Sequence, residues 1–245
     1  MRIAAAQLNY TIGDFESNKI KIIDAINRAK DEQVDLVIFA EQAISGTPAY
    51  DLLNKVTFLE LCEDALVEIA AFCEGISVLV GLPVQHGVGT ESAAAFIHNR
   101  KINRFITKKN ITSRDERLFI SPGVGPEFFK IGSHKVCVVI GEDIRYEEEY
   151  SGRADTIINM GASHYQRAIV EQRYERMRKG AFRMGANMVF VNQVGGHTDV
   201  VYDGSSAIFN EKGEAIALLK NFEEDFAVID LDADNPVLEI PYQNK

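Results

Sequence analysis

Residues 34–41 read VDLVIFAE, an apolar run broken only by Asp35 that ends in a glutamate. A run of this length, rich in Val, Ile and Leu, is typical of a strand buried on both faces, as in a parallel sheet. Another apolar run lies at residues 3–8. Between the two, residues 17–30 have apolar positions at helical spacing, with Ser17 as a possible N-cap. The order strand, helix, strand predicts the start of an α/β fold.

The same alternation continues after residue 41. Thr57 and Glu60 have the spacing of a capping box and predict a helix that ends at Gly75. The run ISVLVGLP at residues 76–83 then predicts another buried strand. Because strands separated by helices pair in parallel, the first 85 residues favour a parallel sheet core.

Many strands and few helices are predicted in the rest of the chain. A third helix is expected from about Arg167 to Met184, stopping at Gly185. Since a single sheet of a dozen strands tends to split, we expect two packed sheets covered by helices. The remaining strand candidates are residues 93–98, 103–107, 127–131, 135–140, 156–160, 188–194, 205–209, 215–219 and 227–231.

Composition fits one globular domain over residues 1–245. The chain is 46% hydrophobic and 25% charged, with a formal net charge of −10 that argues against nucleic acid or an anionic membrane as partner. Seven of the 36 acidic residues, and no Lys or Arg, fall within residues 221–240. No run of about 18 apolar residues predicts a membrane span, and three cysteines are too few for a disulfide framework. We therefore expect a cytoplasmic protein.

Several kinds of functional site are excluded by missing motifs. The chain has no G-x-G-x-x-G fingerprint after its first strand, no phosphate-binding G-x-x-x-x-G-K-[ST] loop and no G-x-S-x-G nucleophile turn. Its five histidines show no paired ligand spacing. We accordingly expect neither a bound cofactor nor a metal site.

Charged residues at the ends of buried strands are the candidates that remain. Glu41 follows the run VDLVIFA, Lys108 ends another predicted strand, and Gly141 follows VCVVI and precedes Glu142. Ligands commonly meet α/β sheets at such strand ends. Taken alone, Glu41 could equally form a salt bridge, Lys108 could be a solvated surface lysine, and Gly141 could be an ordinary tight turn.

Taken together and in this order, these runs resemble the nitrilase superfamily of carbon–nitrogen hydrolases, and most closely the glutaminase domain of glutamine-dependent NAD synthetases. The resemblance covers nearly the whole chain and implies an α-β-β-α sandwich of four layers, in which two mixed sheets are flanked by helices. The segments that carry it are IAAAQLNYTIGDFESN, VDLVIFAEQAISGTPAYDLL, VLVGLP, TKKNI with DERLFISPG, VVIGEDIRY, IINMGASHY, MVFVNQVGG and VVYDGSSAIFN.

The resemblance also implies roles for individual residues. Glu41 matches the family's general base and Lys108, with Lys109 as its alternative, the lysine that stabilises the oxyanion. Glu116 matches a second family glutamate. An amide is a poor electrophile, so this chemistry needs a thiolate made by a nearby base and a fixed cation where negative charge develops. The position of the nucleophilic cysteine is Gly141 here.

None of the three cysteines is expected to replace that nucleophile. Cys137 lies four residues before Gly141 on the same predicted strand, about 13 Å away at the rise of a strand. Cys62 and Cys73 are placed on one face of the second helix, about 16 Å apart, as small core residues.

Other departures fall around the same predicted pocket. Thr47 stands where the family's glutaminases usually have a tyrosine, Arg145 replaces an aromatic residue, and His164, which follows Ser163, replaces a proline. The loop between Lys108 and the Asp-Glu pair is also about three residues shorter than expected for the family's glutaminases. Several pocket walls therefore differ at once, which puts glutamine as the ligand in doubt.

These observations leave three functional hypotheses. The first is a nitrilase-fold domain without covalent amidase activity, binding a small amide-like ligand or serving as an assembly subunit. The second is an active amidase or glutaminase in which Glu41 or Glu142 activates a water. The third is an active enzyme from which the nucleophile was removed at position 141.

Partners are indicated only indirectly. The six basic residues of the third helix fit a solvated face, with oligomer packing as the alternative; they are Arg167, Arg173, Arg176, Arg178, Lys179 and Arg183. The resemblance implies a homo-oligomer. No ATP-binding loop of the synthetase type occurs, so a synthetase half is not expected within this chain, and a separate synthetase chain is a candidate partner.

Overall fold

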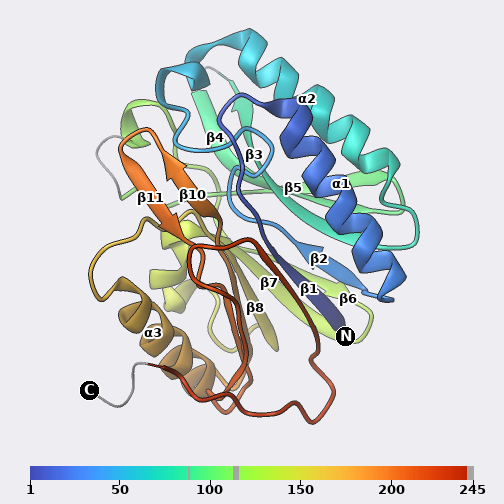
Figure 1. The fold of residues 1–245 in the computed structure, drawn as a ribbon, viewed down its shortest axis with the longest axis vertical. Coiled ribbons are helices and arrows are strands. Elements are labelled where there is room, and N and C mark those ends of the chain that lie inside the picture. Colours follow the sequence, from blue (N-terminus) through green and yellow to red (C-terminus); the bar gives the residue numbers. More distant parts are fainter. Residues whose placement is uncertain (88, 113–115, 242–245) are drawn as a thin grey trace.

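The first sheet is built around the N-terminal strand-helix alternation (Figure 1). The structure, a computed structural model, describes residues 1–87, 89–112 and 116–241. Strands β1, β2 and β3 pair in parallel, as the sequence predicts, and antiparallel strands complete the sheet on both sides. Its order is β14-β1-β2-β3-β4-β5. The bounds are β1 (Arg2–Gln7), β2 (Leu36–Ile38), β3 (Ser77–His86), β4 (Gly89–His98), β5 (Lys101–Thr107) and β14 (Asp225–Asp230).

The second sheet repeats this plan with a parallel centre and antiparallel flanks. Its order is β13-β12-β9-β8-β7-β6, in which β7, β8 and β9 are parallel. A separate hairpin pairs β10 with β11. The bounds are β6 (Glu127–Ile131), β7 (His134–Ile140), β8 (Thr156–Met160), β9 (Asn187–Val191), β10 (Val194–His197), β11 (Val200–Asp203), β12 (Ala207–Phe209) and β13 (Ala215–Leu218).

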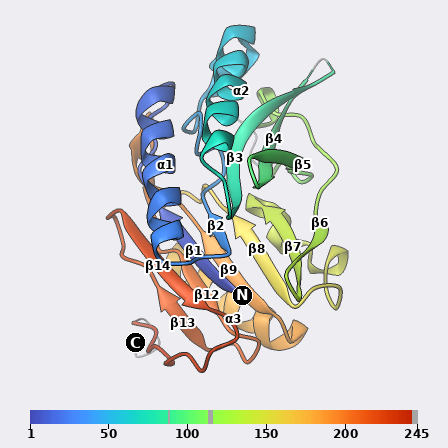
Figure 2. The ribbon, with the colours of Figure 1, turned by 90° about the vertical axis from the view of Figure 1, so that its right-hand side faces the viewer.

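Helices cover the outer faces of both sheets, so the predicted α-β-β-α arrangement of four layers is confirmed (Figure 2). Helices α1 (Phe15–Asp31) and α2 (Val56–Ala71) pack on the first sheet, and α3 (Ile169–Met184) packs on the second. Between the sheets, apolar side chains such as Ile38 and Val138 form a core of their own. Short 3₁₀ turns are η1 (Tyr50–Asn54), η2 (Glu116–Leu118), η3 (Gly141–Arg145) and η4 (Glu147–Glu149).

The N-caps predicted for the first two helices were wrong, although the helices exist. Helix α1 is capped by Asp14, whose Oδ1 accepts a hydrogen bond from the Ser17 backbone N–H at 3.1 Å. Helix α2 begins at Val56, so the spacing of Thr57 and Glu60 does not form a capping box. Its end at Ala71 leaves Cys73 beyond the helix, not on it with Cys62 as predicted. Helix α3 ends before Gly185 as expected, with that glycine in the left-handed conformation.

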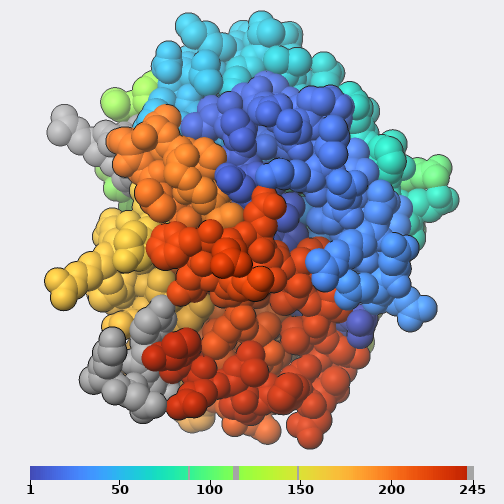
Figure 3. All heavy atoms as spheres, in the orientation of Figure 1, coloured from blue at the N-terminus to red at the C-terminus, as the bar shows by residue number. Residues whose placement is uncertain are grey.

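The acidic stretch of residues 221–240 has partners at the N-terminal end of the chain. Strand β14 pairs antiparallel with β1, and the Met1 ammonium contacts Asp230 and Asp232. Glu224 accepts a hydrogen bond from Lys21 Nζ at 2.7 Å. Figure 3 shows the N-terminal and C-terminal segments bordering one another on this face.

Candidate functional site

Three segments that leave the two sheets bring Glu41, Lys108 and Gly141 together. Glu41 lies three residues beyond β2, Lys108 directly follows β5, and Gly141 directly follows β7. The Glu41 backbone N–H donates to the Gly161 carbonyl at 3.1 Å, which ties the end of the first sheet to the end of the second. The packing of the sheets therefore places residues that are about 100 positions apart in one buried location.

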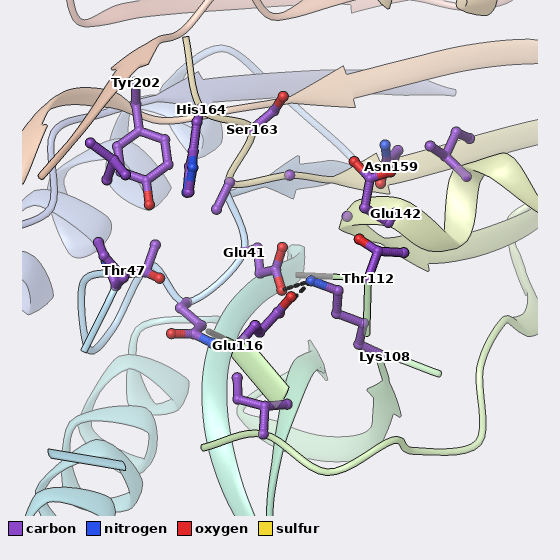
Figure 4. Close-up of a pocket in the computed structure, with 18 of the residues that line it drawn as sticks. Glu41, Thr47, Lys108, Thr112, Glu116, Glu142, Asn159, Ser163, His164 and Tyr202 are labelled. Carbon is purple, nitrogen blue, oxygen red and sulfur yellow. Dashed lines mark hydrogen bonds and ion pairs between the residues drawn. The ribbon is translucent and has the colours of Figure 1, made fainter. Parts of the chain in front are cut away.

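The Lys108 ammonium lies between two carboxylates (Figure 4). Its Nζ atom is 3.1 Å from Glu41 Oε1 and 2.6 Å from Glu116 Oε1. Lys108 and Glu41 are both buried, and the Ser92 hydroxyl donates to Glu41 Oε1 at 2.8 Å. Two acids share one cation, so this cluster carries a formal charge of −1 when all three groups are ionised.

Burial and charge shift the pKa values of this cluster in identifiable directions. Burial alone would lower the pKa of Lys108, but Glu41 and Glu116 outweigh it and raise that pKa above its ordinary value. Burial raises the pKa of Glu116 against the opposing effect of Lys108, and the negative charge of Glu41 adds to the increase. Lys108 is therefore a fixed cation, whereas Glu116 is protonated more readily than an ordinary glutamate.

Gly141 occupies the point at which Glu41 and Lys108 converge. A Cβ atom at this position would lie 2.8 Å from Glu41 Oε2 and 3.1 Å from Lys108 Nζ. The φ angle of Gly141 is +53°, in the left-handed region that glycine adopts most readily. Any side chain at residue 141 would begin inside the cluster, beside both the Glu41 carboxylate and the Lys108 ammonium.

A cavity of about 420 Å³ opens beside these residues, and all nine sequence-predicted site residues line it. Lys109, the alternative to Lys108, does not: its Nζ is 2.8 Å from Glu149 Oε1, and its backbone N–H donates to Asp143. Residues 113–115 of the loop that was expected to be short lie outside the described residues. The predicted lining residues are Glu41, Thr47, Lys108, Glu116, Gly141, Glu142, Arg145, Ser163 and His164.

One side of the cavity is formed by aromatic and small polar side chains. The ring of His164 packs edge-on against Tyr202, with 5.2 Å between centroids, and Thr47 lies on the same side (Figure 4). Burial lowers the pKa of His164, which favours the neutral imidazole. The Tyr50 hydroxyl donates to Asp199 Oδ1 at 2.9 Å. These groups give this wall hydrogen-bonding capacity, and Asp199 adds a negative charge to it.

Helix α3 contributes cavity residues that the sequence analysis assigned to a solvated face. That prediction was wrong for Arg173, which is buried and forms a two-pronged ion pair with Asp203 at 3.0 and 3.2 Å. Arg173 also donates to the Ser163 hydroxyl at 3.0 Å. Arg176, assigned to the same solvated face, is half-buried and also lines the cavity. Lining residues not singled out from sequence include Tyr50, Phe119, Asn159, Phe190, Asp199 and Tyr202.

The three cysteines lie away from the cavity and are chemically quiet. Each is buried and free, and none lines the cavity wall. Burial raises the pKa of Cys62, Cys73 and Cys137 to about 12 in each case, so their thiols stay protonated at neutral pH. Cys137 packs under α3, in the outer core of the second sheet.

Two negative findings apply to the described part of the chain. Within it, no group of three or more His, Cys, Asp or Glu side chains is arranged to hold a metal ion. No helix in the same residues is long and apolar enough to cross a membrane.

Comparison with known proteins gives the family to which this site belongs. The family profile described as carbon-nitrogen hydrolase matches residues 2–235. The chain belongs to this family. Among curated members, it is 34% identical over 245 residues to the glutamine-dependent NAD(+) synthetase of Thermotoga maritima, covering 96% of this chain and 42% of that protein. It is 31% identical to the corresponding Aquifex aeolicus protein over 95% of this chain and 42% of that one. The chain thus spans less than half the length of these relatives.

Solved structures of family members have the same fold. The glutamine-dependent NAD+ synthetase of Acinetobacter baumannii superposes with a TM-score of 0.88 at 27% identity, covering 97% of this chain and 48% of that one. An amidase of the nitrilase superfamily from Nesterenkonia AN1 superposes with a TM-score of 0.83 at 22% identity, covering 96% of this chain and 92% of that one. The chain is therefore a carbon-nitrogen hydrolase domain related to the glutaminase part of NAD synthetases.

Proposed function

We propose that this carbon-nitrogen hydrolase domain has no covalent amidase activity and uses its pocket to bind a small amide-like ligand. The observation that carries the proposal is Gly141. The resemblance assigns the nucleophilic cysteine to this position, where a Cβ would lie 2.8 Å from Glu41 Oε2 and 3.1 Å from Lys108 Nζ. Base and cation are present, and the side chain that would form the bond to carbon is not.

No other described thiol can take the place of that side chain. Cys137 is under α3, and Cys62 and Cys73 belong to the core beneath α1 and α2. Their raised pKa values also keep them protonated. By contrast, one structure of the Nesterenkonia amidase carries acrylamide added to its active-site cysteine.

The remaining groups suit the recognition of a primary amide. The Lys108 ammonium can donate to an amide oxygen, while Glu41 Oε2 can accept from an amide N–H. Both side chains are buried, so these hydrogen bonds would form away from competing water. Without a residue-141 side chain, a bound amide can approach this pair closely and remain intact.

Ammonia release from glutamine, succinamide and butyramide tests the proposal directly. We expect no turnover by the natural chain and a gain of turnover in Gly141→Cys, because the thiol would lie between Glu41 and Lys108. Gly141→Ala is the matched control, since alanine imposes the same left-handed backbone strain of about 1–2 kcal/mol without a nucleophile. Adding Glu41→Gln to Gly141→Cys should abolish the gained activity.

The alternative of a water-based hydrolase makes the opposite prediction. In that case the natural chain would release ammonia, and Glu41→Gln alone would abolish the release because the base would no longer activate the water. That result would overturn the proposal.

A further inference from the structure

A second polar region lines the cavity on the side of helix α3. Ile169, Arg173 and Arg176 lie on one face of this helix, at intervals of four and three residues, and all three line the cavity. In Figure 4, Asn159 and Glu142 lie on the same side of the view as Lys108, across from Thr47 and Tyr202. The cavity therefore has a distinct region beneath α3, separate from its aromatic wall.

Arg176 is the basic residue of α3 whose charge is not balanced. Its side chain is half-buried and lines the cavity, and it makes no ion pair with a side chain that the structure describes. The other basic residues of the helix are all paired: Arg173 with Asp203, Arg178 and Lys179 with Glu175, and Arg183 with Glu147. A partly desolvated guanidinium without a counter-ion is costly unless an anion binds to it.

Asn159 supplies a second, independent sign of a missing ligand. It is only 5% exposed, it lines the cavity, and its Oδ1 atom has no hydrogen-bond partner. None of the described groups donates to or accepts from its side-chain amide. Leaving such a group unpartnered costs about 1–3 kcal/mol, so buried amides are normally satisfied by protein, water or ligand.

The nearby charges favour an anion with a single charge. Arg145 forms an ion pair with Glu142, so these two residues nearly cancel, and Glu147 is taken by Arg183. Arg176 remains as one surplus positive charge. Glu142 and Glu147 are both close enough to influence Arg176, and they would repel a dianion such as a phosphate. A carboxylate matches this balance and can accept two hydrogen bonds from a guanidinium.

We propose that Arg176 and Asn159 form a subsite for the carboxylate of a small ligand whose amide end lies at Glu41 and Lys108. This inference rests on the proposed function for the amide end, and the carboxylate end is independent of it. The Arg176 guanidinium would hold the carboxylate, and Asn159 would hydrogen-bond to the ligand beside it. The ligand class is then an ω-amide of a dicarboxylic acid, which has one charge at neutral pH.

Two probes of nearly equal size separate the two ends of this ligand. Succinamate has a carboxylate and an amide, whereas succinamide has two amides and no charge. Their dissociation constants are measured by calorimetry at low salt for the natural chain, Arg176→Gln, Arg176→Lys and the control Lys179→Gln. Lys179 is an exposed residue of the same helix, paired with Glu175 and absent from the cavity wall.

We expect succinamate to bind the natural chain at least about tenfold more tightly than succinamide, because a charge-assisted hydrogen bond is lost with the charge. This ratio should fall to about one in Arg176→Gln, be partly kept in Arg176→Lys, and be unchanged in Lys179→Gln. Thermal unfolding checks that each variant is folded. If Arg176→Gln does not fold, the comparison of Arg176→Lys with Lys179→Gln decides.

Several outcomes would overturn the subsite, and they differ from those that would overturn the proposed function. A ratio near one in the natural chain, an unchanged ratio in Arg176→Gln, or binding of neither probe would each refute the subsite. Ammonia release from succinamate by the natural chain would refute the proposed function. With such turnover, a Michaelis constant that rises in Arg176→Gln and not in Lys179→Gln would still support the subsite.

Discussion

Two buried polar clusters meet the same cavity and differ in how completely their members are paired. Arg173 lines the cavity from the first cluster, and Glu41, Lys108 and Glu116 line it from the second. In the cluster of Arg173, Asp203 and Asn192, each charge has an opposite partner, and the Asn192 side chain bonds to Ser163 and Gly204. In the cluster of Glu41, Lys108 and Glu116, two acids share one cation, and residue 141 contributes no side chain. The charges of the first cluster are balanced, which stabilises the fold. The second cluster has one more acid than it has cations.

Breaking the satisfied cluster should have the largest effect on stability. Arg173→Met leaves Asp203, which is fully buried, without its counter-ion. We expect a loss of about 3–5 kcal/mol in the free energy of unfolding, measured with denaturant. Arg178→Met is the control on the same helix: its pair with Glu175 is largely exposed and should contribute about 0–1 kcal/mol. Equal losses in the two variants would contradict the distinction.

Replacing Asn192 or Asn159 with leucine compares a satisfied buried amide with an unsatisfied one. Asn192→Leu removes partners from the Ser163 backbone and the Gly204 carbonyl, and should cost about 1–3 kcal/mol of stability. Asn159→Leu removes an oxygen that has no partner, and should raise stability by about 1 kcal/mol. Denaturant unfolding of both variants without added ligand tests this. A loss in Asn159→Leu as large as that in Asn192→Leu would show that Asn159 is already satisfied.

The smallest effect concerns pH. The pKa of Glu116 is raised above its ordinary value of 4.5, mainly by burial. Protonated Glu116 therefore contributes stability that is fully present below pH 4.5 and is lost as the pH rises through its value in the folded protein. Glu116→Gln should gain stability relative to the natural chain as the pH rises from 4.5 to 7.5. Glu211→Gln, an exposed control, should show no such trend; a parallel pH dependence for both variants would contradict this assignment.

Much of the fold could be predicted because its strands are apolar runs between helices with clear periodicity. Strands β6 and β8 match their predicted bounds. The hairpin of β10 and β11 was missed, because Gly195 and Gly196 weaken a strand pattern and the predicted strand at 188–194 ran past the end of β9. The N-caps of α1 and α2 were misassigned because an N-cap depends on which loop side chain reaches the first turn, and sequence spacing alone does not decide that.

Some residues of the candidate site could likewise be predicted from the sequence, and others could not. Glu41, Lys108 and Gly141 follow predicted strands, so the sequence could place them at one edge. The roles of Arg173 and Arg176 could not be assigned from charge alone, because both occur in a helix rich in basic residues. One signal was available: the buried stripe of α3 includes Val170, Tyr174 and Met177, and Arg173 and Arg176 immediately flank it.

The pairing of the first strand with the last also affects how the molecule assembles. Strand β1 has β14 as its neighbour on one side, more than 200 residues away in sequence. During synthesis, β1 therefore presents an open edge until residues 225–230 have been made, and such edges invite pairing with other chains. A contact of this span also slows folding, since a very long loop must close before the pairing stabilises the sheet. Asp230 and Asp232 bind the Met1 ammonium and so stabilise one end of this β1–β14 pairing.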